Sequence, residues 1–206
     1  MKIWRTANAG VLLDIDGVRI LIDGVCQKLY PYEATTADIR NELCVNLPDV
    51  LLYTHYHDDH YDKTYANIYK SKTLRSVYGP EFALCVDFGG VKIKGVPTRH
   101  IGKSDFEHAS YIIEGTKCVW FMGDASPLDA KKISGEKSPD VIIVPYAYVT
   151  TKTAWEFTKS LNCEKIILVH MPPIKDDSYG LWEQMEDTTG KDDSICIPKM
   201  GETIIL

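Results

Sequence analysis

The segment Thr54-His55-Tyr56-His57-Asp58-Asp59-His60 decides what this sequence predicts. It follows directly on the apolar run of residues 48–53, which is typical of a strand buried on both faces of a sheet. Burying several imidazoles and carboxylates together is costly unless they pair or bind a metal ion. Neutral imidazole and carboxylate are natural ligands of divalent ions. A solvated polar loop is the alternative, but further candidate ligands elsewhere in the chain favour a metal site.

The spacing within this segment predicts two neighbouring groups of ligands. His55 and His57 are two residues apart, so in an extended segment their side chains point to the same side. Asp59 and His60 fall in the turn that follows and can reach an adjacent position.

Three other predicted strands also deliver a His or an Asp at their ends. His100 follows the predicted strand 91–98, Asp124 follows the strand 117–122, and His170 follows the strand 165–169. Functional groups are expected where strands emerge at a sheet edge. Five of the six histidines therefore belong to one predicted site.

The sixth histidine, His108, leaves an ambiguity. It precedes the predicted strand 109–114 and could replace His100 as a ligand. We prefer His100, because it ends a strand whereas His108 begins one.

The remaining pattern predicts a layered α/β arrangement. Hairpins are expected at 9–16 with 18–23, around Asp16-Gly17, and at 109–114 with 117–122. A helix over 62–71 has Asp62 as its N-cap, and strands 140–145 and 165–169 flank a helix over 151–161. Further strands are expected at 74–78, 195–197 and 203–206, and Leu181, Trp182 and Met185 suggest a short helix. No linker is visible, so residues 1–206 are expected to form one domain.

Composition narrows the class of protein. The 206 residues carry a formal net charge of −6 and show no basic footprint, so a nucleic-acid partner is not expected. Neither a membrane span nor a secretory signal is visible, and the six cysteines form no CxxC pair. We therefore expect a cytoplasmic protein with reduced thiols and no membrane partner.

The motif H-x-H-x-D-H after a strand, followed by a His, a Gly-Asp pair and a last His at strand ends, resembles the metallo-β-lactamase-fold hydrolase superfamily. Residues 8–13 and 20–24 look like the first hairpin and first motif Asp of that superfamily. Residues 98–100, 111–124 and 145–170 look most like the small branch that includes ascorbate-6-phosphate lactonase. The resemblance implies a four-layer αββα sandwich of two mixed β-sheets, with helices on the outer faces.

Carried over by position, the resemblance implies two groups of ligands and a bridge: His55, His57 and His100 for the first metal, Asp59, His60 and His170 for the second, and Asp124 between them. Asp23 would brace the ligand loops as a buried carboxylate, although an ordinary turn Asp before Gly24 explains it equally well. The implied cofactors are two divalent ions, with zinc as the first choice and manganese or iron left open. A diiron relative typically carries Glu where this chain has His57, which favours a hydrolytic site.

The implied reaction is attack of a hydroxide, held by the two metals, on a lactone, ester or phosphoester of a small, anionic substrate. Asp59 would orient the hydroxide and take its proton. Candidate substrate-binding residues are Tyr146 and Tyr148, after the strand 140–145, and the cations Arg99, Lys103 and Lys152. A phosphodiesterase or ribonuclease, and a non-catalytic metal-binding module, are the alternatives. The net negative charge counts against a nuclease, and the complete set of ligands counts against a non-catalytic module. A homo-oligomer is left open.

Overall fold

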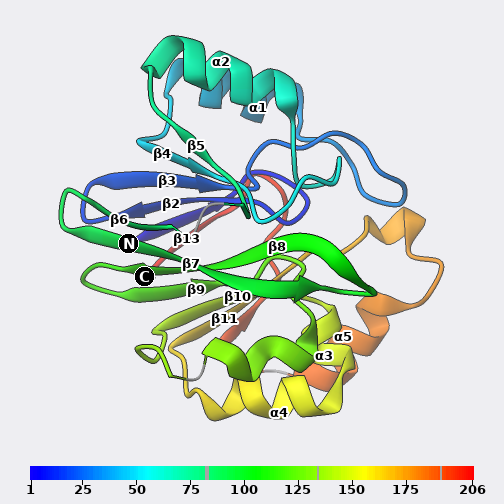
Figure 1. Ribbon diagram of the computed structural model, residues 1–206. Helices are drawn as coiled ribbons and strands as arrows, with labels where there is room; N and C mark the ends of the chain where they lie inside the picture. Colours follow the sequence, from blue (N-terminus) through cyan, green and yellow to red (C-terminus); the bar gives the residue numbers. More distant parts are fainter. Residues whose placement is uncertain (82–83, 134, 191) are drawn as a thin grey trace.

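Two β-sheets pack face to face in the computed structural model, and helices cover both outer faces (Figure 1). The structure describes residues 1–81, 84–133, 135–190 and 192–206, and for residues 103–106 and 130–132 the backbone alone. The predicted four-layer αββα sandwich is confirmed.

The first sheet has six strands in the order β13-β1-β2-β3-β4-β5. Its β1, β2 and β3 pair antiparallel, and β3, β4 and β5 pair parallel, so the sheet is mixed. Its strands are β1 (Lys2–Arg5), β2 (Val11–Ile15), β3 (Val18–Ile22), β4 (Val50–Leu52), β5 (Val77–Tyr78) and β13 (Thr203–Ile205). Helices α1 (Ala37–Val45) and α2 (Lys63–Thr73) cover its outer face (Figure 1).

The second sheet has seven strands in the order β12-β11-β10-β9-β8-β7-β6. It combines parallel pairing from β12 to β9 with antiparallel pairing from β9 to β6. Its strands are β6 (Cys85–Phe88), β7 (Val91–His100), β8 (Lys103–Glu114), β9 (Cys118–Phe121), β10 (Val141–Pro145), β11 (Lys165–Val169) and β12 (Ile195–Cys196). Its outer face carries the helices α3 (Ala147–Thr150), α4 (Lys152–Ser160) and α5 (Leu181–Thr189), and two 3₁₀ segments are η1 (Pro127–Ile133) and η2 (Ile174–Asp176).

Strands β4, β9, β10 and β11 are buried on both faces, because the other sheet covers one face and helices cover the other. In β10, Val141 and Ile143 belong to the core between the sheets, whereas Ile142 and Val144 belong to the core beneath the helices. Side chains alternate across a strand, so every position of such a strand must be apolar. This explains why the short aliphatic runs in the sequence predicted strands correctly.

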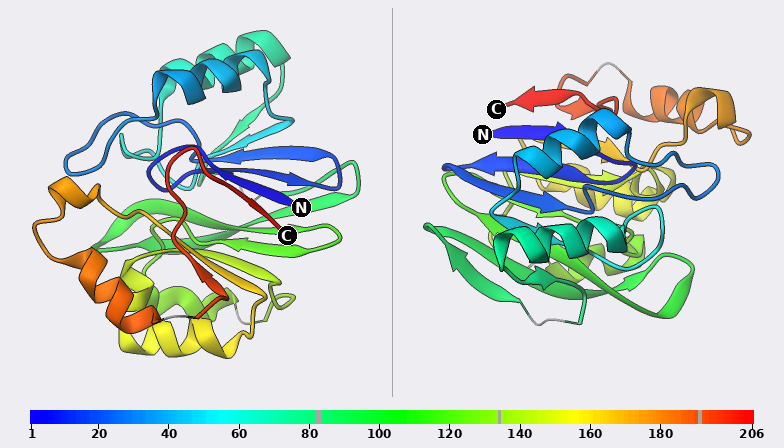
Figure 2. Two further views of the ribbon diagram at one scale, coloured as in Figure 1. Left: turned by 180° about the vertical axis from the view of Figure 1, so that it is seen from behind. Right: turned by 90° about the horizontal axis from the view of Figure 1, so that it is seen from above.

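The expected hairpins, the helix over 151–161 and the strand–helix–strand order are present. Asp16 and Gly17 both have positive φ, as a two-residue turn of type I′ requires. The C-terminal segment crosses from β12 in one sheet to β13 in the other (Figure 2). The sequence did not predict β1, β6 or α1.

The six cysteines are all unpaired, and only Cys26 and Cys118 are fully buried. Among the described residues, no helix is long and apolar enough to cross a membrane. A cytoplasmic location stays a prediction.

Asp62 caps α2 as predicted, and we expect its removal to be costly. Its carboxylate accepts the backbone N–H of Tyr65 (2.7 Å) and pairs with Arg40 (2.9 Å). We expect Asp62→Ala to lower the free energy of unfolding by about 1–2 kcal/mol at pH 7 in urea denaturation. Lys63→Ala, at the exposed next position, is the control.

The loss of stability caused by Asp62→Ala should become smaller as the pH falls. Burial alone would raise the pKa of Asp62, but hydrogen bonds from Arg40 and the first turn outweigh it and lower the pKa. The stabilisation is then present above the unfolded pKa of about 3.9 and is lost as pH falls through the lower folded pKa. If the difference in free energy of unfolding between the native protein and Asp62→Ala stayed constant down to acid pH, this explanation would be contradicted.

Candidate metal centre

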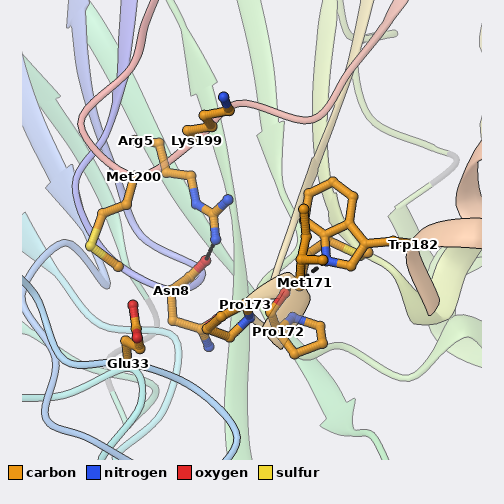
Figure 3. A pocket seen from close by; sticks show the side chains of 10 residues that line it. Arg5, Asn8, Glu33, Met171, Pro172, Pro173, Trp182, Lys199 and Met200 are labelled. Atoms are coloured by element: carbon orange, nitrogen blue, oxygen red, sulfur yellow. Dashed lines mark hydrogen bonds between the residues drawn. The ribbon is translucent and has the colours of Figure 1, made fainter. Parts of the chain in front are cut away.

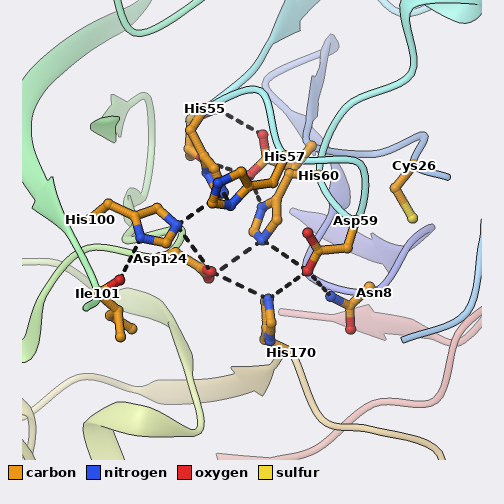
Figure 4. A network of polar contacts seen from close by, with 12 residues as sticks. Asn8, Cys26, His55, His57, Asp59, His60, His100, Ile101, Asp124 and His170 are labelled. Carbon is orange, nitrogen blue, oxygen red and sulfur yellow. Dashed lines mark hydrogen bonds and ion pairs between the residues drawn. The ribbon is translucent and has the colours of Figure 1, made fainter. Parts of the chain in front are cut away.

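The predicted ligands converge at one edge of the sandwich, where four strands end. His55 to His60 follow β4, His100 is the last residue of β7, Asp124 follows β9, and His170 follows β11. Strands from both sheets therefore contribute to one cluster (Figure 4).

Three imidazoles form the first group of nitrogen atoms. The Nε2 atom of His55 lies 3.1 Å from His57 Nδ1 and 3.3 Å from His100 Nε2. Ligands that sit about 2.1 Å from a tetrahedral zinc ion lie about 3.4 Å from one another. His55, His57 and His100 thus have the separation that a shared metal ion needs.

The second group surrounds two carboxylates. The Nε2 atom of His170 lies 3.1 Å from Asp59 Oδ2 and 3.4 Å from Asp124 Oδ2. The Nε2 atom of His60 lies 3.4 Å from Asp124 Oδ1. Asp124 also approaches His100, at 3.7 Å, so its carboxylate faces both groups.

Several of these atoms are buried without a hydrogen-bond partner in the described part of the chain: His60 Nε2, His170 Nε2 and Asp124 Oδ1. Their mutual distances are short, but the geometry is not that of hydrogen bonds. Leaving buried polar atoms unpaired is costly. A metal ion among them would satisfy all of them, so the residues fit a metal site.

The electrostatics favour the ligating forms of His55 and Asp124. Burial lowers the pKa of His55 well below its usual range, and the neighbouring His60 adds to the effect. Burial alone would raise the pKa of Asp124, but the imidazoles of His170 and His60 outweigh it and hold that pKa well below its usual range. At His60 burial alone would lower the pKa, but the carboxylates of Asp124 and Asp23 outweigh it and raise that pKa well above its usual range. A neutral imidazole and an ionised carboxylate are the forms that bind divalent ions.

Asp23 braces the segment that carries the histidines. It is fully buried and accepts hydrogen bonds from the backbone N–H (2.8 Å) and hydroxyl (2.6 Å) of Thr54. The Oδ2 atom of Asp23, which accepts the Thr54 hydroxyl, also lies 2.9 Å from His60 Nδ1, which leaves His60 Nε2 directed at the cluster. Such a carboxylate–histidine contact fixes the ring orientation and the tautomer of a ligand.

Gly123 allows the chain to turn into the site just before Asp124. Its φ is +54°, and a Cβ atom there would lie 2.6 Å from Thr54 Cγ2 and 2.9 Å from His108 Nε2. His170 and Asp23 also have positive φ, at 63° and 49°. Backbone strain of this kind clusters at functional sites.

We expect Gly123→Ala to destabilise the protein and to displace Asp124. Strain at positive φ together with overpacking lowers the free energy of unfolding by about 1–3 kcal/mol. Gly135→Ala is a matched control, because a Cβ atom at Gly135 meets nothing within 4 Å. Equal urea midpoints for the two variants would contradict the argument.

The expectation that His108 begins a strand is wrong. β8 starts at Lys103, so His108 lies inside the strand, where it pairs with Thr98 of β7. Its Nδ1 lies 2.7 Å from the hydroxyl of Thr98, and burial lowers its pKa to about 3. His100 rather than His108 shares a group with His55 and His57.

A cavity of about 150 Å³ opens beside the cluster. Tyr146, one of the candidate substrate-binding residues, lines it together with His100, Asp124 and His170. Tyr32 also lines it and packs edge-on against His170, with ring centroids 4.2 Å apart. Sequence reasoning missed Tyr32, because it lies in an irregular loop with no motif to single it out.

Three other predicted substrate-binding residues, Tyr148, Arg99 and Lys152, do not line this cavity. Tyr148 is fully buried and packs in the core beneath the helices of the second sheet. Arg99 forms a two-pronged ion pair with Asp129 (2.7 and 3.1 Å), and Lys152 is exposed at the start of α4. The side chain of Lys103 lies outside the described residues.

A four-layer αββα sandwich with a His/Asp cluster at one edge is the arrangement of metallo-β-lactamase-fold proteins. A family model described as Beta-lactamase superfamily domain matches residues 3–170. The chain belongs to this superfamily, which confirms the predicted resemblance at that level.

Relatives along the whole chain agree with this assignment. A metal-dependent hydrolase of Ligilactobacillus salivarius is 25% identical, over 91% of this chain and 94% of its own length. A possible metal-dependent hydrolase from Veillonella parvula has the same fold, with a TM-score of 0.75 at 18% identity over 100% and 99% of the two chains. An isothiocyanate hydrolase from Delia radicum gut bacteria has a TM-score of 0.71 at 17% identity, again over 100% and 99%. The prediction of a metal-dependent hydrolase is confirmed as a class, and the likeness to ascorbate-6-phosphate lactonase stays a prediction.

Proposed function

We propose that this protein is a hydrolase with two divalent ions, zinc by first choice, that acts on a lactone, ester or phosphoester of a small, anionic substrate. The observation that carries the proposal is the convergence of buried imidazole and carboxylate atoms that find no hydrogen-bond partners among the described residues. The cluster needs strand ends of both sheets, which supports the proposal that residues 1–206 form a single domain.

The proposed ligands follow from the two groups. His55, His57 and His100 hold one ion, and Asp59, His60 and His170 hold the other. Asp124 joins the groups, since its carboxylate lies within 3.4–3.7 Å of a nitrogen in each. We expect His100→Ala to lose metal and His108→Ala to retain it; loss in His108→Ala alone would reverse the assignment.

The two ions would supply an activated water and an electrophile that polarises the substrate oxygen. Asp59 is placed to orient that water and accept its proton, because its Oδ2 lies at the cluster beside His170. Asn8 donates a hydrogen bond to the same oxygen (3.3 Å) and holds the carboxylate in position. Tyr146 and Tyr32 would contact the substrate from the wall of the small cavity.

A hydrolysis panel tests the proposal. It contains a lactone, an aryl ester, a phosphodiester, a thioester and a β-lactam, and adds an isothiocyanate because a structural neighbour hydrolyses that group. We expect one class to be hydrolysed, with loss of activity after chelation and recovery when zinc is restored. Turnover that survives removal of all metal would refute the proposal.

A further inference from the structure

A second cavity, of about 250 Å³, is shown with its lining residues in Figure 3 and has no part in the function proposed above. It is lined by residues from β1 and the loop after it, the loop before α1, the segment after His170, α5 and the C-terminal segment, among them Arg5, Asn8, Met171, Trp182, Lys199 and Met200. Its size suits a small organic group rather than a single water molecule.

The wall between this cavity and the metal centre is one residue thick. Asn8 lines the cavity, and its side chain donates to Asp59 Oδ2 (3.3 Å). The backbone carbonyl of Asn8 accepts the N–H of His170 (3.2 Å), and the next residue, Met171, lines the cavity. A group bound here therefore lies next to the reacting centre.

The cavity is lined by a buried cation, Arg5, that no carboxylate of the described residues contacts. Arg5 is only 6% exposed, and its hydrogen bonds in the described structure go to three backbone carbonyls, those of Ala7 (3.2 Å), Asn8 (2.8 Å) and Pro198 (2.6 Å). A desolvated guanidinium without an anionic partner is costly. An anion in the cavity would compensate it.

The surrounding charges also favour an anion. Lys199 stands at the rim as a second cation. The acidic residue of the wall, Glu33, is paired with Lys175 (2.8 Å). Glu202 accepts the backbone N–H of Lys199 (2.8 Å) and acts on Arg5 only through space. This excess of positive charge stands out in a chain whose net charge is −6.

The rest of the wall is apolar and adaptable. Trp182 is fixed by a hydrogen bond from its indole N–H to the carbonyl of Pro172 (2.8 Å). Met171 and Met200 add flexible thioethers, which fill gaps around ligands of different shape. The lining thus combines a flat aromatic surface with cations at one side.

We propose that this cavity is a subsite that receives an apolar, negatively charged part of the substrate, remote from the bond that is cleaved. The proposal that the occupant is part of a substrate rests on the hydrolase function proposed above. The proposal that the cavity binds an apolar anion is independent of that function.

Isothermal titration calorimetry with 4-nitrobenzoate and its uncharged analogue 4-nitrobenzamide tests the binding. We expect the anion to bind at least about tenfold more tightly than the amide. Lys199→Gln should weaken the affinity for the anion about threefold and leave the affinity for the amide unchanged. Lys159 is an exposed lysine on α4, so Lys159→Gln should change neither affinity. Met200→Trp should weaken the affinity for both compounds at least about tenfold, because the larger side chain fills the cavity. Arg5→Gln is avoided, because Arg5 ties the two chain ends together.

Two further readouts separate this proposal from the hydrolase function. His57→Ala, which disrupts the proposed metal centre, should still bind 4-nitrobenzoate; loss of binding would place the anion on the metal instead. 4-Nitrobenzoate should inhibit the native enzyme competitively, and the Met200→Trp variant should be resistant to this inhibition. Equal affinity for anion and amide, or inhibition that is not competitive, would overturn the subsite even if metal-dependent hydrolysis is found.

Discussion

Asp124→Asn is expected to lose most of the bound metal and to lower kcat/KM by about 10³-fold or more, equivalent to about 4 kcal/mol of transition-state stabilisation. Asp124 is the residue whose carboxylate faces both groups of ligands, with His60, His100 and His170 at 3.4–3.7 Å. An amide keeps the shape but removes the negative charge that balances these imidazoles and, in the proposed centre, two metal ions. Asp124→Asn should therefore lower the occupancy of both ions. A substitution of a residue that binds one ion should lower the occupancy of that ion alone.

The matched control is Asp193→Asn, an exposed Asp whose backbone carbonyl accepts a hydrogen bond from Lys165, at the opposite end of β11 from His170. Metal content by elemental analysis and kcat/KM should match the unmodified protein in this control. If Asp124→Asn retained two equivalents of metal and full activity, Asp124 would not be the bridge between the groups.

Asp59→Asn is expected to lower kcat by about 10²–10⁴-fold while the protein stays folded. Asp59 Oδ2 lies 3.1 Å from His170 Nε2 and accepts the amide of Asn8, so an Asn side chain can keep the local contacts but cannot take a proton. The free energy of unfolding should change by less than about 1 kcal/mol, since shape and volume are retained.

Asp58 provides the control in the same turn. It precedes Asp59 directly but is exposed, so Asp58→Asn should leave kcat unchanged. Equal rates for Asp59→Asn and Asp58→Asn would remove Asp59 from the proposed mechanism.

The ligand cluster could be predicted because its residues are tied to strand ends. His55, His57, Asp59 and His60 lie in one short motif, and their approximate geometry follows from local chain spacing. His100 ends β7, Asp124 and His170 follow the apolar strands β9 and β11, and the ends of strands meet at one edge. The layered α/β arrangement followed from the apolar runs, and the four-layer sandwich was implied by the family resemblance.

The features that were missed depend on contacts remote in sequence. β1 forms its sheet edge with β13, where Lys2 pairs with Ile205, and no local pattern announces such a pairing. Tyr32 reaches His170 from an irregular loop, and the second cavity is assembled from five separate segments. Tyr148 and Arg99 show the converse: proximity in sequence to the site did not bring their side chains to the cavity, because core packing and Asp129 hold them elsewhere.

Elemental analysis of metal bound to the purified protein tests the central claim most directly. The proposed centre predicts about two equivalents of a divalent metal, close to one equivalent after His57→Ala, and little metal after Asp124→Asn. Full-length protein that is folded by circular dichroism and binds no divalent metal even after reconstitution would contradict the account. The cluster of His55 to His170 would then have to serve a purpose other than metal chemistry.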